Sequence, residues 1–496
     1  MRTTLLVSFL FSSLMACTAD EPLPNPNHGT EGDKVLTSTD VVPAGAICAA
    51  GGIAHNTGID TNQNGVLDGS EINSTTYTCS HRALMRDDAI SSGAVCPGGG
   101  ANIHIGHDLN DDGALEDSEV ETSTLLCNSD ALYTGDLKTS DFATPESQDK
   151  LSRVRVVTGN LTIDSAVAMP SLTTVGGNVD LEIGTLVELP ALTQIIGTLK
   201  GPPSVLLNGE QNQAKGVMIR MPALTEIGDV SMTSWVDGGV FSAPELTTVD
   251  DELDLGGKFA TIELDSLARV GFSLRFDGVQ TATLSLPALE TAVSGIYLTG
   301  AMTSVDLPAL KATPSLSLYG VNIASVSMPL LESGGSMHFG RMAALTTLSM
   351  PKLTTTTELS LLGMPKLTSL DLSSLGSAGD LYINGLPMTD LAAFSSIRSV
   401  GALTIENDLN LVDLGGLDQV TAAKTVVIEA NPVLTSFTGI DHITKLDGGL
   451  TIQDNVALAS LSTLAALTNV TGTIAISDNP ALAQTDVAAF LARLGR

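Results

Sequence analysis

Aromatic and basic residues are scarce in this sequence. Aromatic residues make up 3% of the 496 residues, and Trp235 is the single tryptophan. This scarcity argues against a carbohydrate-binding platform built on stacked rings. Lysine and arginine number 23 against 55 aspartate and glutamate residues, which gives a formal net charge of -32. Because phosphate binding needs clustered cations, we expect no nucleic-acid partner; the surface suits divalent cations or basic partners.

The sequence also lacks an apolar run that could cross a membrane as a helix. Such a helix needs about 20 consecutive apolar residues, and no run of that length is present. Residues 1–16 instead combine Arg2, a short apolar run and the small residue Ala16 in the order typical of a secretory signal peptide. We therefore expect export, followed by a flexible tether over residues 17–33, which are rich in proline, asparagine and glycine.

The segment from Leu14 to Cys17 resembles the lipobox of bacterial lipoproteins. That resemblance implies that Cys17 is acylated, with palmitate as an expected acyl chain, and becomes the first residue of the mature chain. Several acyl chains on one cysteine give stable membrane anchoring. The expected location is the cell envelope, at the outer membrane or the cell surface. The alternative is an ordinary signal peptide followed by a chance cysteine.

The four remaining cysteines repeat with one period. Cys48 and Cys96 are 48 residues apart, as are Cys79 and Cys127, which indicates a tandem duplication. Four cysteines allow three pairings. The duplication favours Cys48 with Cys79 and Cys96 with Cys127, because each copy then has its own bridge. In an oxidising compartment each bridge would stabilise its copy by about 3 to 4 kcal/mol.

Each copy carries a twelve-residue acidic loop between its cysteines. We call the copies module 1 (residues 34–80) and module 2 (residues 81–130). Both loops match the EF-hand calcium loop, with oxygen-bearing side chains at positions 1, 3, 5 and 9, glycine at 6 and glutamate at 12. Calcium takes six to eight oxygen ligands, and position 7 supplies a main-chain carbonyl. The expected ligands are Asp60, Asn62, Asn64, Val66, Asp68 and Glu71 in module 1 and Asp108, Asn110, Asp112, Ala114, Glu116 and Glu119 in module 2.

The surroundings of the loops predict short strands and turns in place of the helices of an EF-hand, because threonine favours strands and the glycines at 51 and 52 favour turns. Residues 18–130 contain 18 acidic and three basic residues, a charge of -15. A structural calcium ion would relieve this repulsion and stiffen the modules into a spacer between the membrane and the rest of the chain. Solvated acidic turns are the alternative. The paired modules resemble a two-cysteine repeat of secreted bacterial proteins, which implies no activity.

A transition-metal pair at His104 and His107 is disfavoured. Module 1 has Asn56 and Ile59 at the equivalent positions, and His107 directly precedes a calcium-type loop.

From residue 134 to residue 496 the sequence is an imperfect repeat. Its marker is an apolar residue, proline, any residue and leucine, and the prolines Pro287, Pro308, Pro329 and Pro351 are spaced 21, 21 and 22 residues apart. Periods of 20 to 29 residues are typical of leucine-rich solenoids. Two short alternating runs in each coil predict two strands, stacked into parallel sheets along the solenoid. Near the C-terminus asparagines recur, as at Asn431, and predict a ladder that satisfies backbone groups in the bend.

Residues typical of a helix start lie at both ends of the repeat, at Thr144–Pro145 and at Thr485–Asp486. They predict two short helices that cover the first and the last coil. By its period and coil pattern, the region resembles receptor L domains and related bacterial leucine-rich surface proteins. The expected fold is mainly β: a receptor L-domain-like solenoid of parallel strands with short capping helices, preceded by two small modules stapled by disulfides and calcium.

Catalytic signatures of hydrolases, zinc proteases and nucleotide-binding enzymes are absent from the sequence. The resemblance implies binding along a sheet face, so we expect a non-catalytic binding or adhesion protein with an unknown protein or glycan ligand. A structural envelope protein is the main alternative. A polysaccharide-active solenoid enzyme is less favoured, because the basic residues are too dispersed to form a catalytic cluster.

Overall fold

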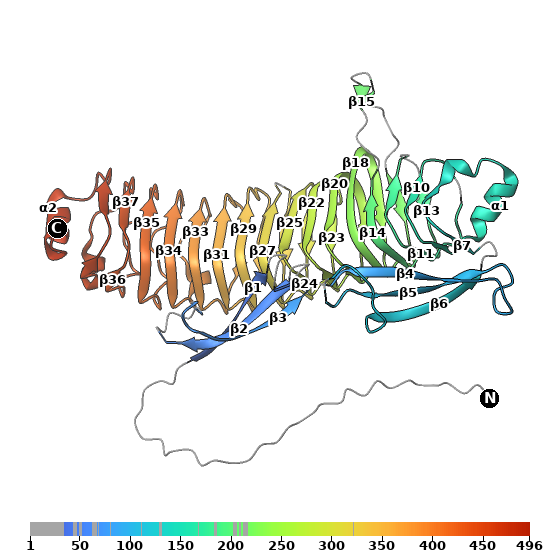
Figure 1. The fold of residues 1–496 in the computed structure, drawn as a ribbon. Helices are drawn as coiled ribbons and strands as arrows, with labels where there is room; N and C mark the ends of the chain where they lie inside the picture. Colours follow the sequence, from blue (N-terminus) through green and yellow to red (C-terminus); the bar gives the residue numbers. More distant parts are fainter. Residues whose placement is uncertain are drawn as a thin grey trace, which may run out of the picture.

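The structure is a computed structural model. The residues that it describes are 34–42, 47–48, 52–61, 67, 69–79, 81–110, 112–127, 131–166, 168–182, 186–201, 206–207, 210–211, 217–320 and 322–496. The expected signal peptide, Cys17 and the tether lie outside them. The described chain has 46% strand and 7% helix and forms a parallel β-solenoid of about 15 turns (Figure 1). This confirms the predicted class, a mainly β solenoid with short helices.

Each module is a three-stranded antiparallel sheet. The strands are β1 (Lys34–Val42), β2 (Gly52–Asp60) and β3 (Ile72–Cys79) in module 1, and β4 (Ala83–Ile90), β5 (Gly100–His107) and β6 (Val120–Cys127) in module 2. Disulfides join Cys48 to Cys79 and Cys96 to Cys127, with Cα atoms 5.2 Å apart in each pair. The predicted pairing is therefore confirmed, and strands flank both acidic loops as predicted.

The main sheet of the solenoid is parallel and runs through almost every coil. Its strands are β7 (Leu132–Tyr133), β8 (Leu137–Lys138), β9 (Val156–Val157), β10 (Leu161–Ile163), β11 (Thr174–Val175), β12 (Val179–Leu181), β13 (Leu186–Glu188), β14 (Gln194–Lys200), β17 (Met218–Arg220), β18 (Glu226–Ser242), β19 (Thr248–Val249), β20 (Leu253–Glu263), β21 (Arg269–Val270), β22 (Ser273–Val279), β24 (Thr291–Ala292), β25 (Gly295–Gly300), β27 (Ala312–Tyr319), β29 (Ser333–Gly340), β31 (Thr355–Leu362), β33 (Ser377–Asn384), β34 (Ser399–Glu406), β35 (Ala422–Glu429), β36 (Lys445–Leu446), β37 (Leu450–Gln453), β38 (Asn469–Val470) and β39 (Ile474–Ser477). A separate antiparallel pair, β15 (Leu206–Leu207) and β16 (Glu210–Gln211), lies between β14 and β17 along the chain.

A second, narrower parallel sheet lies across the core from the main sheet. It contains β23 (Thr283–Ser285), β26 (Ser304–Asp306), β28 (Ser325–Ser327), β30 (Thr347–Ser349) and β32 (Ser369–Asp371). Two strands per coil, as predicted, are thus present in the middle of the solenoid. Within the described residues this sheet ends at β32, and later coils carry the 3-10 helices η2 (Ala392–Phe394) and η3 (Ser462–Ala466).

Apolar residues at alternate positions of both sheets fill the space between them. In β27, Leu316 and Leu318 are fully buried, whereas Ser317 and Tyr319 lie on the other face of the strand and keep part of their surface exposed. Each fully buried leucine contributes roughly 1.5 to 3 kcal/mol relative to an exposed one. Leu286 precedes the corner proline Pro287 and is itself buried. The repeat marker therefore places its apolar residues in the core and its proline at the corner.

Short helices cover both ends of the core. Helix α1 (Pro145–Arg153) is capped by Thr144, whose hydroxyl accepts a hydrogen bond from the Ser147 backbone N–H, as the sequence predicts. Helix α2 (Gln484–Arg493) buries Phe490 against the last coil. The helix begins one residue before Thr485, and no side chain caps its N-terminus. No helix among the described residues is long and apolar enough to span a membrane.

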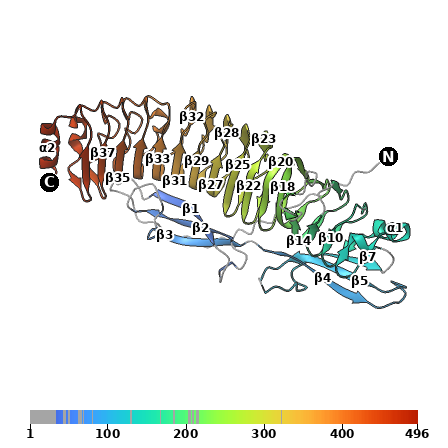
Figure 2. The same cartoon turned by 90° about the horizontal axis from the view of Figure 1, so that it is seen from above.

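The two modules lie one after the other along the edge of the main sheet where its strands begin (Figures 1 and 2). Ala101, Ile103 and Leu126 of module 2 form one small core with Val156 of β9, and β1 of module 1 contacts β27. Residues 34–127 therefore lie against the solenoid, and the spacer role expected from the sequence stays a prediction. The acidic modules pack against the solenoid because module 2 has too few apolar residues to bury on its own.

The predicted asparagine ladder is present in the last coils. Asn431, Asn455 and Asn479 are buried, and the side-chain oxygen of each accepts a hydrogen bond from the backbone N–H of its counterpart one coil earlier. Their amide groups donate to backbone carbonyls, for example from Asn431 to Ile405 at 3.0 Å. The ladder thus satisfies buried backbone groups at a bend where the preceding residue has a φ of 54° to 58°.

Asp408 occupies the ladder position before Asn431. Its Oδ1 accepts a hydrogen bond from the Leu386 backbone N–H at 2.6 Å, but its Oδ2 is buried and has no hydrogen-bond partner. The equivalent asparagine atom donates to the carbonyl of an isoleucine, and Ile383 has the matching place one coil earlier. A carboxylate cannot donate there, and burial raises the pKa of Asp408 to about 7.

We predict that Asp408→Asn stabilises the protein by about 1 to 3 kcal/mol at pH 7.5, because the amide can donate where the carboxylate cannot. The folded state holds its proton up to about pH 7, whereas the unfolded state loses it near the ordinary aspartate value. The advantage of the variant should therefore grow as the pH rises from about 4 to 7 and then level off. Urea denaturation across this range measures it.

Asn431→Asp is the matched control and should be destabilised at pH 7.5, because it repeats the mismatch one coil later. Equal stability of Asp408→Asn and the wild type at every pH would contradict this assignment of the ladder.

Candidate functional site

The acidic loop of module 2 joins β5 to β6 and is folded around its own side chains. Asp108 accepts hydrogen bonds from the backbone N–H groups of Asp112 and Gly113, at 3.1 and 2.8 Å. Gly113, at loop position 6, has a φ of +83°, a conformation that favours glycine. The tight turn expected of a calcium loop is therefore present.

The glutamate at position 12 is turned into this loop. Glu119 is 6% exposed, and its Oε1 accepts from the backbone N–H groups of Leu109 and Asn110 at 2.8 and 3.1 Å. A hydrogen bond between Glu116 and Glu119 raises the pKa of the Glu116 carboxyl and lowers that of Glu119. Two acidic side chains therefore lie close together at the centre of the loop, where a cation would relieve their repulsion.

Module 1 repeats this arrangement in the part that can be described. Glu71 is 4% exposed, and its Oε1 accepts hydrogen bonds of 2.8 Å from both the backbone N–H and the hydroxyl of Thr61, the residue that corresponds to Leu109. Asn62, Asn64, Val66 and Asp68 lie outside the described residues, as does the side chain of Asp60. The two position-12 glutamates thus have equivalent contacts.

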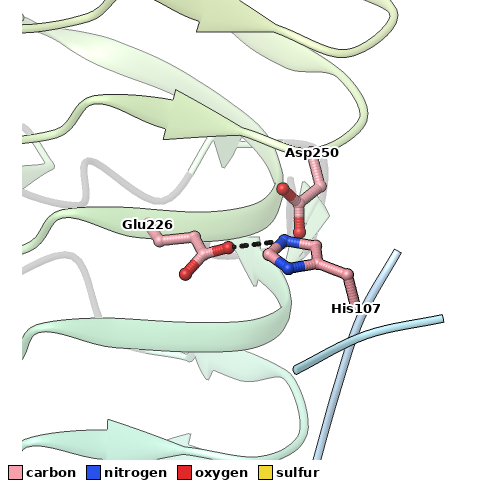
Figure 3. Close-up of side chains that lie close together, drawn as sticks. All are labelled: His107, Glu226 and Asp250. Atoms are coloured by element: carbon pink, nitrogen blue, oxygen red, sulfur yellow. Dashed lines mark ion pairs between the residues drawn. The ribbon is translucent and has the colours of Figure 1, made fainter. Parts of the chain in front are cut away.

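A second cluster of ionisable groups joins module 2 to the solenoid. His107 at the end of β5, Glu226 at the start of β18 and Asp250 directly after β19 point toward one another (Figure 3). One candidate ligand atom from each lies within 4.8 Å of the others. Their candidate ligand atoms are close enough together that the three side chains could hold one metal ion.

The imidazole of His107 bridges two carboxylates. Its Nε2 lies 3.1 Å from Glu226 Oε1, and its Nδ1 lies 2.9 Å from Oε1 of Glu121 on β6. Hydrogen bonding to Glu226, assisted by Glu121, raises the pKa of His107 to about 9, and the same contact lowers the pKa of Glu226. In the absence of another cation His107 is therefore charged at neutral pH.

The negative charge of Asp250 is offset less by neighbouring positive charge than that of Glu226. Burial and the charge of Glu226 raise its pKa to about 7, against the opposing effects of His107 and Arg269. Its Oδ2 accepts a hydrogen bond of 3.3 Å from the Ala83 backbone N–H in β4. Module 2 thus contacts the acidic pair through both β4 and β5.

The sequence pattern does not indicate this cluster. Glu226 and Asp250 are distant from His107 along the chain, and neither lies in a metal-binding motif. The one available signal is that His107 replaces the Ile59 of module 1, which marks a difference between the copies. His104 contacts Asp88 and Ser123 within its own module.

The solvent-facing side of the main sheet is a second candidate surface, which we call the outward face. Side chains at one register position of successive strands form a column along it, in which Ser360 is buried and the others keep part of their surface exposed: Arg275, Tyr297, Ser317, His338, Ser360, Tyr382 and Thr404. The Arg275 guanidinium lies 4.8 Å from the ring centre of Tyr297. The Tyr382 hydroxyl donates to Glu406 at 2.7 Å, and Glu406 is next to Glu429 in register.

Comparison with known protein families finds a match for the two modules. A family model described as "Domain of unknown function (DUF7151)" matches residues 35–79 and again residues 83–127, which are the two disulfide-closed sheets. No curated protein matches the chain.

We predict that His107→Ala loosens module 2 from the solenoid, because Glu226 and Asp250 then face each other without the imidazolium between them. Digestion of module 2 by a protease should become several-fold faster. His104→Ala, whose ring contacts lie within module 2, should leave the rate near that of the wild type.

The same contact gives a pH dependence. Because the pKa of His107 is raised, the imidazolium stabilises the contact between module 2 and the solenoid fully below about pH 6.5. This stabilisation is lost as the pH rises through about 9. Wild-type cleavage should therefore accelerate between these values, while His107→Ala changes less. Equal cleavage rates of both proteins over the whole pH range would show that the ion pair between His107 and Glu226 does not hold module 2 to the solenoid.

Proposed function

We propose that this chain is a lipid-anchored protein of the bacterial cell envelope that binds a partner without catalysis along the outward face of its main sheet. Calcium in the module loops is the structural cofactor in this proposal. The observation that carries it is the column of polar and aromatic side chains that continues from coil to coil. A leucine-rich solenoid with such a face offers one long, flat contact surface, which is how repeat proteins bind.

The chemistry of the outward face favours a basic or hydroxyl-rich partner. Tyrosine and arginine are common anchors in protein interfaces, and Tyr297 and Tyr382 both keep part of their surface exposed. The acidic residues Glu406 and Glu429 add negative charge to the same face. A net charge of -32 would increase the rate of encounter with a positively charged protein surface.

Two features support a lipid anchor: the Leu14–Cys17 motif and the two disulfides. Disulfides form in oxidising compartments such as the periplasm and the cell surface. A protein held there by lipid could present its solenoid to other molecules, or could serve as a purely structural component of the envelope, which is the main alternative. A polysaccharide-active enzyme would need a cluster of acidic and basic catalytic groups; this is the weaker alternative.

Binding along the outward face is tested with arrays of basic peptides and of glycans. We expect the purified chain to bind members of one class, and Tyr382→Ala combined with Glu406→Gln to weaken that binding at least about tenfold, since anchor residues typically contribute 2 kcal/mol or more. Thr347→Ala, on the second sheet, is the control and should bind like the wild type. Binding that is equal in all three proteins would place the contact elsewhere.

Calcium should stabilise the modules of the full chain. At a hundredfold excess over the dissociation constant, one ion contributes roughly 2.7 kcal/mol per site. We expect a higher melting temperature of the module transition with calcium than with chelator, and loss of most of this shift in Glu71→Gln combined with Glu119→Gln. Glu146→Gln, on α1, is the control. A melting curve that calcium does not change would leave the loops as acidic turns.

The lipid anchor is tested by Cys17→Ala in the producing cell. We expect the variant to move from the membrane fraction to the soluble fraction, because the acylation site is lost. Retention in membranes after a high-salt wash would contradict the anchor. Protease treatment of intact cells then distinguishes a surface-exposed binder from an internal structural protein.

A further inference from the structure

The junction of His107, Glu226 and Asp250 brings a nitrogen ligand and two carboxylates together from three separate elements. The candidate ligand atoms lie within 4.8 Å of one another, and the His107 Nε2 to Glu226 Oε1 distance is 3.1 Å. In a tetrahedral zinc site with bonds of about 2.0 to 2.2 Å, neighbouring ligand atoms are about 3.3 to 3.6 Å apart. A small movement of the Asp250 side chain would bring the third ligand to this spacing.

Each of the three side chains also has a partner that holds it in place. Glu121 Oε1 lies 2.9 Å from Nδ1 of His107, so a proton on Nδ1 would leave Nε2 free to act as a ligand. The amide of Gln194 donates to the second oxygen of Glu226 at 2.6 Å, and the Ala83 backbone N–H donates to Asp250. A carboxylate on the far nitrogen of a histidine ligand, and hydrogen bonds on carboxylate ligands, are the usual supports of protein metal sites.

We propose that His107, Glu226 and Asp250 bind one divalent transition-metal ion of the zinc class, which fastens module 2 to the solenoid. The three side chains would supply three ligands, and water would complete the coordination. The imidazole nitrogen favours zinc, cobalt or nickel over calcium, which prefers oxygen ligands. Two partly buried carboxylates against one imidazole also leave a negative charge that a divalent ion would offset.

The site is single and separate from the calcium loops. Module 1 has Ile59 where module 2 has His107, so the duplicated module cannot form an equivalent site. The ion would sit between elements that pack together already, since Ile103 and Leu126 share a small core with Val156. The ion would strengthen a contact that exists already. Removal of the ion by a chelator would therefore make it easier for module 2 to separate from the solenoid.

Cobalt titration of the full chain tests the site, because cobalt occupies zinc sites and absorbs visible light. Cys17→Ser is used as the background in every protein, so that a free thiol adds no ligand, and millimolar calcium is present to saturate oxygen-only loops. We expect one cobalt ion per chain, displaced by one equivalent of zinc. Asp250→Asn, which keeps the size of the side chain, should bind at least about tenfold more weakly, and His107→Ala should bind no cobalt at this site.

His104→Ala is the matched control, and it should keep the stoichiometry of one and the displacement by zinc. Absence of a cobalt spectrum in the parent protein would overturn the proposal, as would unchanged binding in both His107→Ala and Asp250→Asn. Because Asp250→Asn lies on the solenoid, it reports on the site even where His107→Ala releases module 2. The outcome is independent of calcium binding, which the calcium melts measure separately.

Discussion

Backbone pairing between successive coils is the constraint on which the rest of the structure depends. Each parallel strand of the main sheet has its hydrogen-bonding groups satisfied by the coils before and after it, and its buried side chains stack on those of its neighbours, as Leu316 of β27 does on Met337 of β29. A single coil could satisfy neither requirement, so the coils are stable only as a stack. The asparagine ladder and the capping helices solve the same problem at the bends and at the two ends.

The sequence predicts those parts of the structure that a local pattern determines. The proline marker, as at Pro287, predicts the corners because proline cannot continue a strand ladder, and the recurring asparagines predict the ladder around Asn431. The equal cysteine intervals predict both disulfides. Contacts between distant segments have no such signal: His107 meets Glu226 and Asp250 only because module 2 folds back along the solenoid. The packing of module 2 against the solenoid has no local signal either, since nothing local shows that Val156 completes the core of module 2.

Negative charge is concentrated in the modules, so we expect bound cations to affect how firmly the modules are held. The solenoid has a continuous apolar core, whereas each module has only a few buried apolar residues, one disulfide and a strongly acidic loop. The solenoid can therefore remain folded under conditions in which the modules loosen, because its stability comes from burial and backbone pairing. In the proposed function, this separates a rigid binding surface from a cation-dependent element that lies along its edge.

Hydrogen exchange of the full chain, measured with divalent cations and then with chelator, tests this division most directly. The account predicts slow exchange throughout the long strands of the main sheet, from β18 to β35, under both conditions. It predicts faster exchange in β4, β5 and β6 after chelation. Equal protection of the modules with and without cations, or loss of protection in β27, β29 and β31 on chelation, would contradict it.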